Sequence, residues 1–418
     1  MGSEYREKCK TAGCPFDYAG FAFGQSPFHV PPPLERALGE QAGKGHYSAP
    51  DGIPELREAI AGFYKRHFKL GVDASRIVIG SGTKGLIFSV FTMINGDVII
   101  PSPSWIGYFP QLKLLGKHYH TMYLQAKNNY KIQSEELDSF LLNLARENKQ
   151  HLLILNNPNN PTGALYTKEE LTEIANVCRK HNTFVLADEI YALSTYKVED
   201  FTSMGLIYPE GTFITNGLSK DRSAGGYRLG SCILPEKNSD KLRKDFMIIA
   251  ATIYTNVSTP TQYAAIAAYE HNDEIEEYLT ITRKIHEIMG LYFSEEFNKI
   301  DKIQATIPQG AFYFYANFNL LSDDLKRKGV MTSNELGHSL ISHPHHIATV
   351  TGDALMIQPD NYGARIAFVD YDGKKAFEKY KTNPPKSTSD EIEFVKKNAP
   401  RMINGVEKLK AYVEHIQK

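Results

Sequence analysis

The sequence predicts an α/β fold: a mostly parallel sheet of seven strands with helices on both faces, joined to a smaller α+β unit. Seven apolar segments have the length and composition of buried strands, near residues 76–80, 97–101, 118–124, 151–156, 183–188, 212–216 and 228–234. The stretches between them are long enough for crossover helices, and Lys168–Lys180 has the pattern of one. Strands that alternate with helices give a parallel sheet buried on both faces.

The smaller unit is predicted after a long helical region from about residue 260 to 298. We expect its strands at 310–315 and 364–369 and a terminal helix at 389–417. A chain of 418 residues with 42% hydrophobic and 23% charged residues can bury a large core. Its length favours more than one domain.

Composition narrows the classes of partner. The net charge of −1 gives no electrostatic footprint for nucleic acid or for an anionic membrane, so neither is expected as a partner. The longest apolar stretch, 86–100, is interrupted by Asn95-Gly-Asp97, and the first residues hold no hydrophobic signal segment. These features predict a soluble cytoplasmic protein.

Cysteines and histidines give little reason to expect a metal. Cys9, Cys14, Cys178 and Cys232 have neither zinc-type spacing nor the density of a disulfide framework, so free thiols are expected. The run His343-Pro-His345-His346 is the one histidine cluster, and without neighbouring cysteines a structural or surface role is favoured.

A lysine and an arginine eight residues apart follow the sixth predicted strand. Lys220 comes after the apolar strand, and Arg228 follows a glycine-rich turn. A lysine in a desolvated setting forms a Schiff base with an aldehyde, because only its free base is nucleophilic. The planar fork of an arginine suits a phosphate. Alone, however, such a pair is more often two surface charges.

Two further motifs stand at the ends of buried strands upstream. Asn157-Pro-Asn-Asn-Pro-Thr-Gly163 is either a simple turn or a rigid support that presents the Asn160 amide at the carboxyl edge of the sheet. Asp188, with Tyr191 three residues later, either caps a strand-to-helix junction or places an acid in a site.

Taken together and in this order, the motifs with Asn160, Asp188, Tyr191, Lys220 and Arg228 resemble the class I/II aminotransferases, which are fold-type I pyridoxal-phosphate enzymes. The resemblance runs from about residue 24 to 365. It implies a large cofactor-binding domain over 46–290 and a discontinuous small domain over 1–45 and 291–418. It also implies a homodimer with active sites at the interface.

The resemblance assigns chemical roles to these residues. Asp188 pairs with the pyridine nitrogen, where a carboxylate at ~4 Å and an effective dielectric near 20 is worth roughly 4 kcal/mol. Asn160 and Tyr191 hydrogen-bond the 3-hydroxyl oxygen of the cofactor. Lys220 holds pyridoxal 5'-phosphate as a Schiff base and then moves the proton between substrate and cofactor carbons. Arg228 binds the phosphate.

Other residues complete the phosphate and ring sites by the same resemblance. The glycine-rich helix start Ser81–Gly85 offers backbone N–H groups to the phosphate, so Gly82, Thr83 and Lys84 are predicted to bind it. Trp105 either fills the core or stacks on the pyridine ring. Many relatives carry a serine or threonine three residues before the lysine. This chain has Gly217 there, which leaves that donor role to Ser219 or to another loop.

Three residues outside these loops are also implied. Tyr47 resembles the tyrosine that crosses a dimer interface to the partner's phosphate. Arg365 resembles the arginine that binds the α-carboxylate of the substrate, and Gly24 belongs to a segment that closes over it. Gly24 and Arg365, together with Trp105 and Asn160, form the predicted substrate site, whereas Tyr47 belongs to the predicted cofactor site.

The predicted activity is transfer of the amino group of an α-amino acid to a 2-oxo acid. A Cβ–S lyase on the same fold is the first alternative, since it forms the same carbanion. The second is a non-catalytic regulator, which is disfavoured because such proteins carry an N-terminal helix-turn-helix domain and fewer than 25 residues precede Gly24. No arginine near 254–260 matches the one that selects dicarboxylates, which favours a neutral, even aromatic, amino donor.

Overall fold

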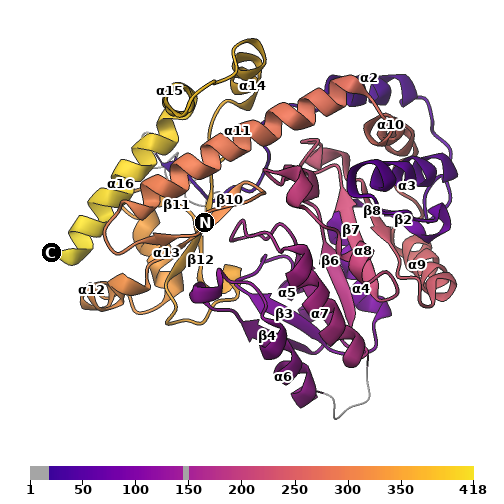
Figure 1. Ribbon diagram of the computed structural model, residues 1–418, viewed down its shortest axis with the longest axis horizontal. Coiled ribbons are helices and arrows are strands. Elements are labelled where there is room, and N and C mark those ends of the chain that lie inside the picture. Colours follow the sequence, from indigo (N-terminus) through magenta and orange to yellow (C-terminus); the bar gives the residue numbers. More distant parts are fainter. Residues whose placement is uncertain (1–17, 145–149) are drawn as a thin grey trace.

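The computed structural model describes residues 18–144 and 150–418 (Figure 1). Its central element is a seven-stranded sheet with the spatial order β2-β8-β7-β6-β5-β3-β4. The strands are β2 (Ile77–Gly80), β3 (Val98–Ser102), β4 (Tyr119–Tyr123), β5 (Leu152–Asn156), β6 (Phe184–Asp188), β7 (Thr212–Gly217) and β8 (Gly230–Ile233). Each falls on a predicted segment, so the α/β fold with a seven-stranded sheet is confirmed.

Most neighbouring strands of this sheet run parallel. β4, β3, β5, β6 and β7 form a continuous parallel set, and only β8 runs antiparallel to both of its neighbours, β7 and β2. The carboxyl ends of β5, β6 and β7 therefore lie side by side at one edge of the sheet, where open α/β folds bind ligands.

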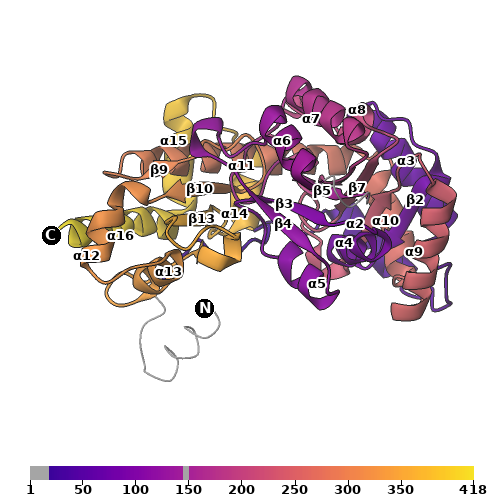
Figure 2. The ribbon, with the colours of Figure 1, turned by 90° about the horizontal axis from the view of Figure 1, so that it is seen from below.

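Alternate residues of the strands pack against different helices. On one face Val98 and Ile154 contact the cluster that includes α4, α5 and α9, whereas on the other Ile99 and Leu153 contact the cluster of α6, α7 and α8. This two-sided burial explains the continuous apolar runs of the strands. The helices around the sheet are α3 (Pro54–Phe68), α4 (Gly82–Met93), α5 (Tyr108–Leu114), α6 (Ser134–Leu144), α7 (Lys168–Lys180), α8 (Met204–Ile207), α9 (Ser239–Ile253) and α10 (Thr259–Tyr269). Figure 2 shows the layers from below.

The predicted helical region 260–298 consists of two helices, α10 and α11 (Asp273–Asn298). They are separated at Asn272, whose side chain caps α11 by accepting from the Ile275 N–H. In Figure 1, α11 extends from the region of α2 and α10 to the smaller unit.

The smaller unit is built on an antiparallel sheet of order β12-β13-β10-β9. Its elements are β9 (Gln304–Ala305), β10 (Tyr313–Asn317), α12 (Ser322–Arg327), α13 (Ser333–Ile341), β11 (Ile347–Ala348), β12 (Val350–Thr351), β13 (Gly363–Ala367), α14 (Gly373–Thr382), α15 (Thr388–Asn398) and α16 (Pro400–Gln417). β10 and β13 match the predicted strands within a few residues.

The single terminal helix predicted at 389–417 is wrong. α15 ends before Ala399, which leaves the helical conformation with φ −123° and ψ 45°, and α16 begins at Pro400. Proline has no N–H to continue the hydrogen-bond ladder and disfavours helical geometry in the residue before it. The helical periodicity on both sides concealed this break.

The segment from Ala19 to Gln41 contacts both the smaller unit and the helices of the large sheet. β1 (Ala19–Gly20) pairs in parallel with β11, and the Ala367 N–H donates to the Phe21 carbonyl, so this segment adds to the smaller unit. α2 (Pro32–Gln41) packs on α10. Among the helices that the structure describes, none combines the length and apolar character needed to cross a membrane.

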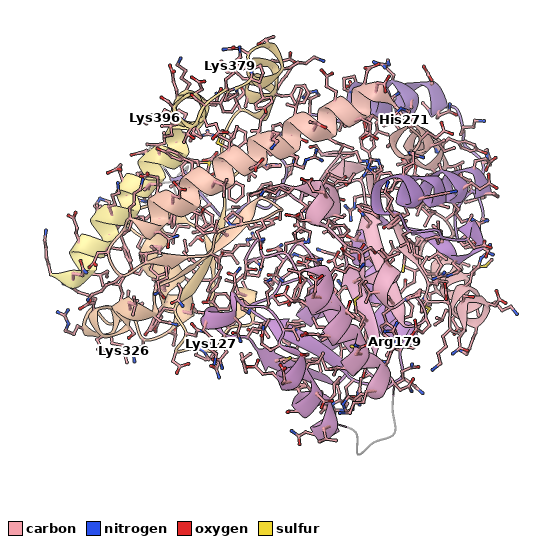
Figure 3. The ribbon with its side chains drawn as sticks, viewed as in Figure 1. Lys127, Arg179, His271, Lys326, Lys379 and Lys396 are labelled. Atoms are coloured by element: carbon pink, nitrogen blue, oxygen red, sulfur yellow. The ribbon has the colours of Figure 1, made fainter. Side chains whose placement is uncertain are left out.

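Charged side chains concentrate on the outside of the fold. Figure 3 labels Lys379 on α14 and Lys396 on α15, which are both exposed. Cys178 and Cys232 are buried free thiols, as predicted, whereas Cys9 and Cys14 lie outside the described residues.

Candidate functional site

A cavity of about 220 Å³ opens at the carboxyl ends of β5, β6 and β7. Its lining includes many of the residues predicted from sequence: Gly24, Thr83, Trp105, Asn160, Asp188, Tyr191, Lys220 and Arg365. Ile106, Asn156, Ile190 and Tyr313 complete the wall and were not predicted. These residues come from positions 24 to 365 of the chain, so one cavity gathers motifs from both sheets.

Lys220 extends into this cavity from the loop that follows β7. Its Nζ donates a hydrogen bond of 2.8 Å to the Gly24 carbonyl. The same Nζ lies 5.8 Å from the ring centroid of Tyr191 and 5.7 Å from that of Phe312. The amine is thus held between aromatic faces and the N-terminal segment, with its end in the cavity.

Asp188 is a buried carboxyl at the end of β6. Tyr108 donates to its Oδ2 at 2.7 Å, and the Thr215 hydroxyl donates to its Oδ1 at 3.4 Å. Burial raises the pKa of Asp188, and the hydrogen bonds from Tyr108, Ile190 and Thr215 partly oppose that rise. A buried carboxyl of this kind becomes a stable carboxylate when a cation binds beside it, and a protonated pyridine nitrogen is such a cation.

The adjacent Glu189 is equally buried but serves another purpose. Its Oε1 accepts from the Ser203 hydroxyl and the Met204 N–H, each at 2.9 Å. Burial raises the pKa of Glu189 to about 8. It caps α8 and does not line the cavity. A helix cap was the alternative role for Asp188. In the structure it is the neighbouring Glu189 that caps a helix, α8.

Arg365 and Asn160 lie together across the cavity. The Arg365 guanidinium is buried and donates to Asn160 Oδ1 at 3.4 Å and to the Ala22 carbonyl at 2.6 Å. Its Nε has no hydrogen-bond partner. A buried guanidinium with an unused N–H is suited to bind a carboxylate.

The start of α4 and the Arg228 side chain together present several hydrogen-bond donors that can bind an anion. A Cβ built on Gly82 would lie 2.5 Å from Nη2 of Arg228, so the guanidinium rests directly on the first turn of the helix. Arg228 Nη1 donates to the Gly225 carbonyl at 2.7 Å. The N–H groups at a helix start and a guanidinium together fit a phosphate. Ser219, half-buried, belongs to the same loop.

Gly217, where many relatives carry a hydroxyl, lies at a close approach of two strands. It pairs with Gly230 in the antiparallel β7–β8 ladder, and a Cβ on it would lie 2.8 Å from the Leu229 carbonyl oxygen. A Cβ on Gly230 would in turn lie 2.8 Å from the Thr83 nitrogen. The two glycines bring the start of α4 against β8, and this packing excludes a side chain at 217.

Trp105 and Lys84 lie at the rim of the cavity. The Trp105 ring lines it and meets Tyr108 edge-on, with centroids 5.0 Å apart. Lys84 Nζ lies 5.5 Å from the Trp105 ring centroid and is exposed. Gly82, Lys84, Ser219 and Arg228 are not part of the cavity wall. Gly82 and Lys84 lie in the first turn of α4, and Ser219 and Arg228 lie in the segment between β7 and β8.

Tyr47 is the predicted site residue that lies apart from the cavity. It is 85% exposed, although it is a large aromatic residue. The arm that carries it is firmly anchored: Thr259 donates to the His46 carbonyl at 2.7 Å, and Gln262 donates to the Ser48 hydroxyl at 2.9 Å. The structure therefore presents Tyr47 on a rigid arm that points outward.

No group of three or more His, Cys, Asp or Glu residues is arranged to hold a metal ion within the described ranges 18–144 and 150–418. His345 instead packs on Tyr412 and His415, with ring centroids 5.1 and 5.4 Å apart.

Tyr108, Thr215 and Tyr313 are the polar contacts that sequence reasoning missed. Tyr108 begins α5, three residues after Trp105, and nothing in the local pattern marks it as a partner of Asp188. Thr215 lies within the strand predicted at 212–216, and its position there gives no sign of a contact with Asp188. Tyr313 lies in an apolar strand whose pattern predicts a core position, so nothing nearby in the sequence indicates a role in the site.

The family model for aminotransferase class I and II matches residues 19–368. Asparagine–oxo-acid transaminase of Streptococcus mutans is 29% identical over 352 residues, covering 80% of this chain and 84% of the relative. Aspartate aminotransferase of Bacillus sp. is 31% identical over 345 residues, with the same coverage.

Solved structures agree on the fold. The aspartate aminotransferase of Thermus thermophilus with maleate superimposes with a TM-score of 0.78, at 22% identity, over 98% of this chain and 95% of that chain. The family match covers most of the chain, and one cavity gathers a lysine, an acid and a buried arginine. The chain belongs to the class I and II aminotransferases, and it is a transaminase that depends on pyridoxal 5'-phosphate.

Proposed function

We propose that this transaminase uses Lys220 both to hold the cofactor and to move the proton of the substrate. Pyridoxal 5'-phosphate, when bound, supplies the electron sink that stabilises the carbanion. Lys220 is the amine whose end lies in the cavity, and it is surrounded by aromatic faces that lower its hydration. The gathering of Lys220, Asp188 and Arg365 in one cavity is the observation that carries this proposal.

The other roles follow from position and chemistry. When the cofactor is bound, the Asp188 carboxylate would accept a hydrogen bond from the protonated pyridine nitrogen, and Asn160 and Tyr191 would donate to the ring oxygen. Gly82, Thr83, Ser219 and Arg228 would hold the phosphate, with Lys84 in the same first turn of α4. Trp105 packs on the ring, and Arg365 with Gly24 holds the α-carboxylate of the substrate.

The amino donor is proposed to be a four-carbon amino acid with a terminal carboxylate or amide. The curated relatives are named for aspartate and asparagine, and these names outweigh the preference for a neutral or aromatic donor that the sequence alone suggested. The acceptor is a 2-oxo acid.

Half-reactions test this assignment. Purified holoenzyme is mixed with aspartate, asparagine or phenylalanine, and the absorbance of the cofactor is followed. We expect aspartate or asparagine to convert it at least about tenfold faster than phenylalanine, a difference of about 1.4 kcal/mol. Faster conversion by phenylalanine would reverse the donor assignment. Sustained ammonia release without an oxo acid would instead favour the lyase.

The enzyme is proposed to be a homodimer in which Tyr47 reaches the cofactor phosphate of the partner. An exposed tyrosine on an arm anchored by Thr259, Gln262 and the Arg243–Asp51 ion pair is otherwise unexplained. Mixing the Lys220→Ala and Tyr47→Phe variants tests this role. If Tyr47 crosses the interface, each mixed dimer contains one site without either defect, and wild-type cofactor affinity reappears in that site. If Tyr47 acts within its own subunit, no such site forms.

Tyr108→Phe is expected to lower kcat by roughly 10–100-fold, because it removes a hydrogen bond to a charged group worth about 1.5–3 kcal/mol. The 2.7 Å bond from Tyr108 favours the ionised form of Asp188, and its loss raises the pKa of that carboxyl further. Stopped-flow half-reactions measure the effect. Tyr123→Phe, on the half-exposed end of β4, is the matched control and should leave kcat unchanged.

Gly217→Ser introduces the hydroxyl that many relatives use for the phosphate, yet it is expected to weaken cofactor binding. Its Cβ would meet the Leu229 carbonyl at 2.8 Å and push β8 away from the start of α4. Equilibrium dialysis of the apoenzyme with pyridoxal 5'-phosphate gives the dissociation constant. We expect a rise of about tenfold or more, as backbone overpacking costs about 1–3 kcal/mol. Tighter binding would show that the strands adjust and the hydroxyl is used.

A further inference from the structure

We infer that Tyr313 is a positioning residue that fixes three functional groups of the site: Tyr191, Arg365 and the backbone at Gly24. This inference rests on the proposed roles of those three groups. Tyr313 is the first residue of β10, is almost fully buried, and lines the cavity. As one aromatic among many in the core, it has an ordinary packing explanation. Three of its contacts, however, are with groups that have proposed roles in the site.

The first contact joins two hydroxyl groups. The Tyr191 hydroxyl donates to the Tyr313 hydroxyl at 3.1 Å, and the two rings meet edge-on at 89° with centroids 5.7 Å apart. A hydroxyl has a single proton to donate. If Tyr191 donates that proton to the ring oxygen of the cofactor, the bond between the tyrosines is made by the proton of Tyr313. Tyr313 thus keeps Tyr191 oriented as a donor, and chained hydrogen bonds strengthen one another.

The second contact holds the arginine. The Arg365 guanidinium lies 4.6 Å from the Tyr313 ring centroid. Arg365 stands opposite Tyr315 in the β10–β13 ladder, so Tyr313 is its diagonal neighbour on the same face of the sheet. A cation over an aromatic face in a buried setting is held in a defined plane. The unpartnered Nε of Arg365 is therefore kept in a fixed orientation beside the cavity.

The third contact explains why residue 24 is a glycine. A Cβ built on Gly24 would lie 2.3 Å from the Tyr313 hydroxyl oxygen and 3.2 Å from the ring carbon that bears it. The Gly24 carbonyl accepts the hydrogen bond from Lys220, and the Ala22 carbonyl accepts one from Arg365. The Tyr313 hydroxyl therefore sets how closely the N-terminal segment approaches Lys220 and Arg365.

A double-mutant cycle of Gly24→Ala and Tyr313→Phe tests the inference. Gly24→Ala alone should lower kcat/KM at least about tenfold, because the methyl group occupies the place of the Tyr313 hydroxyl. In the Tyr313→Phe background the nearest atom is the ring carbon at 3.2 Å, so the same change should cost less than about threefold. The thermal midpoint of the apoenzyme should follow the same pattern: Gly24→Ala should lower it more in the wild-type background than in the Tyr313→Phe background. Equal losses in both backgrounds would overturn the inference.

Tyr313→Phe also has a spectroscopic consequence that simple packing would not produce. The absorbance of the Lys220-bound cofactor changes with pH. Tyr313→Phe should move the midpoint of that change to a higher pH, because Tyr191 becomes a weaker donor to the ring oxygen. We expect kcat to fall roughly tenfold, as for the loss of one hydrogen bond. This measurement remains available if Gly24→Ala does not fold.

Tyr315→Phe is the matched control. Tyr315 is also buried, lies two residues further along β10, and has a hydroxyl without a hydrogen-bond partner. It should leave the titration midpoint unchanged. An equal shift in both variants, or none in Tyr313→Phe, would contradict the role of Tyr313. A wild-type enzyme without any half-reaction would instead reject the proposed function itself.

Discussion

Lys220→Ala should abolish measurable turnover while leaving the fold and a non-covalent cofactor site in place. Proton transfer by a positioned base contributes about 10²–10⁴-fold, and the covalent attachment is lost as well, so we expect a fall of at least about 10³-fold in kcat. Asp188, Arg228 and the first turn of α4 still present their groups to the cofactor. Single-turnover kinetics with aspartate measures the loss, and borohydride reduction followed by mass spectrometry shows whether cofactor remains attached to the chain.

Lys237→Ala provides the comparison for this variant. Lys237 is an exposed lysine whose Nζ donates to Asn182 and lies outside the cavity, so its removal should change neither turnover nor attachment. Wild-type turnover in Lys220→Ala would overturn the assignment of the base. Attachment of the cofactor at another lysine would overturn the assignment of the anchor.

Asp188→Asn should have the second largest effect, a fall in kcat of about 10³-fold. A carboxylate ~4 Å from the protonated pyridine nitrogen is worth roughly 4 kcal/mol at an effective dielectric near 20, which is about three decades in rate. The asparagine keeps the shape of the side chain but carries no charge. The hydrogen bond from Tyr108 then stabilises no ion.

Glu189→Gln is the control for Asp188→Asn. It also replaces a buried carboxyl group by an amide, but at a position that does not line the cavity. Glu189 is the next residue and is as deeply buried, but it faces Ser203 and Met204. We expect kcat within about threefold of wild type, with any loss confined to thermal stability. Similar kcat losses in the two variants would mean that burial, and not the charge of Asp188, governs the rate.

The local sequence pattern was sufficient to predict most of the fold. Six strands of the large sheet are short, mostly apolar runs between turn residues, and this pattern is set by burial on both faces. The seventh, the edge strand β4, is partly exposed. The helix predicted at Lys168–Lys180 has these bounds in the structure, where a capping box of Thr167 and Glu170 fixes its start. At 399–400 the periodicity of two helices concealed a break that the proline enforces.

Three residues predicted from sequence line the cavity, and each follows a strand within a motif. Asn160, Asp188 and Lys220 stand after β5, β6 and β7, and parallel neighbours bring their carboxyl ends to one edge. Tyr108 and Tyr313 could not be predicted in this way. Their function depends on a partner far along the chain, Asp188 for one and Gly24 for the other.

The sequence by itself determined the sheet, the family resemblance, the cofactor and the order of the catalytic motifs, because these are carried by residues close together in the chain. The tertiary structure decided which side chains meet. It showed that Asp188 is held by Tyr108, that close strand packing excludes a side chain at Gly217, and that Tyr313 contacts Tyr191 and Arg365. Contacts between distant segments depend on the packing of whole sheets and helices, and no local pattern records them.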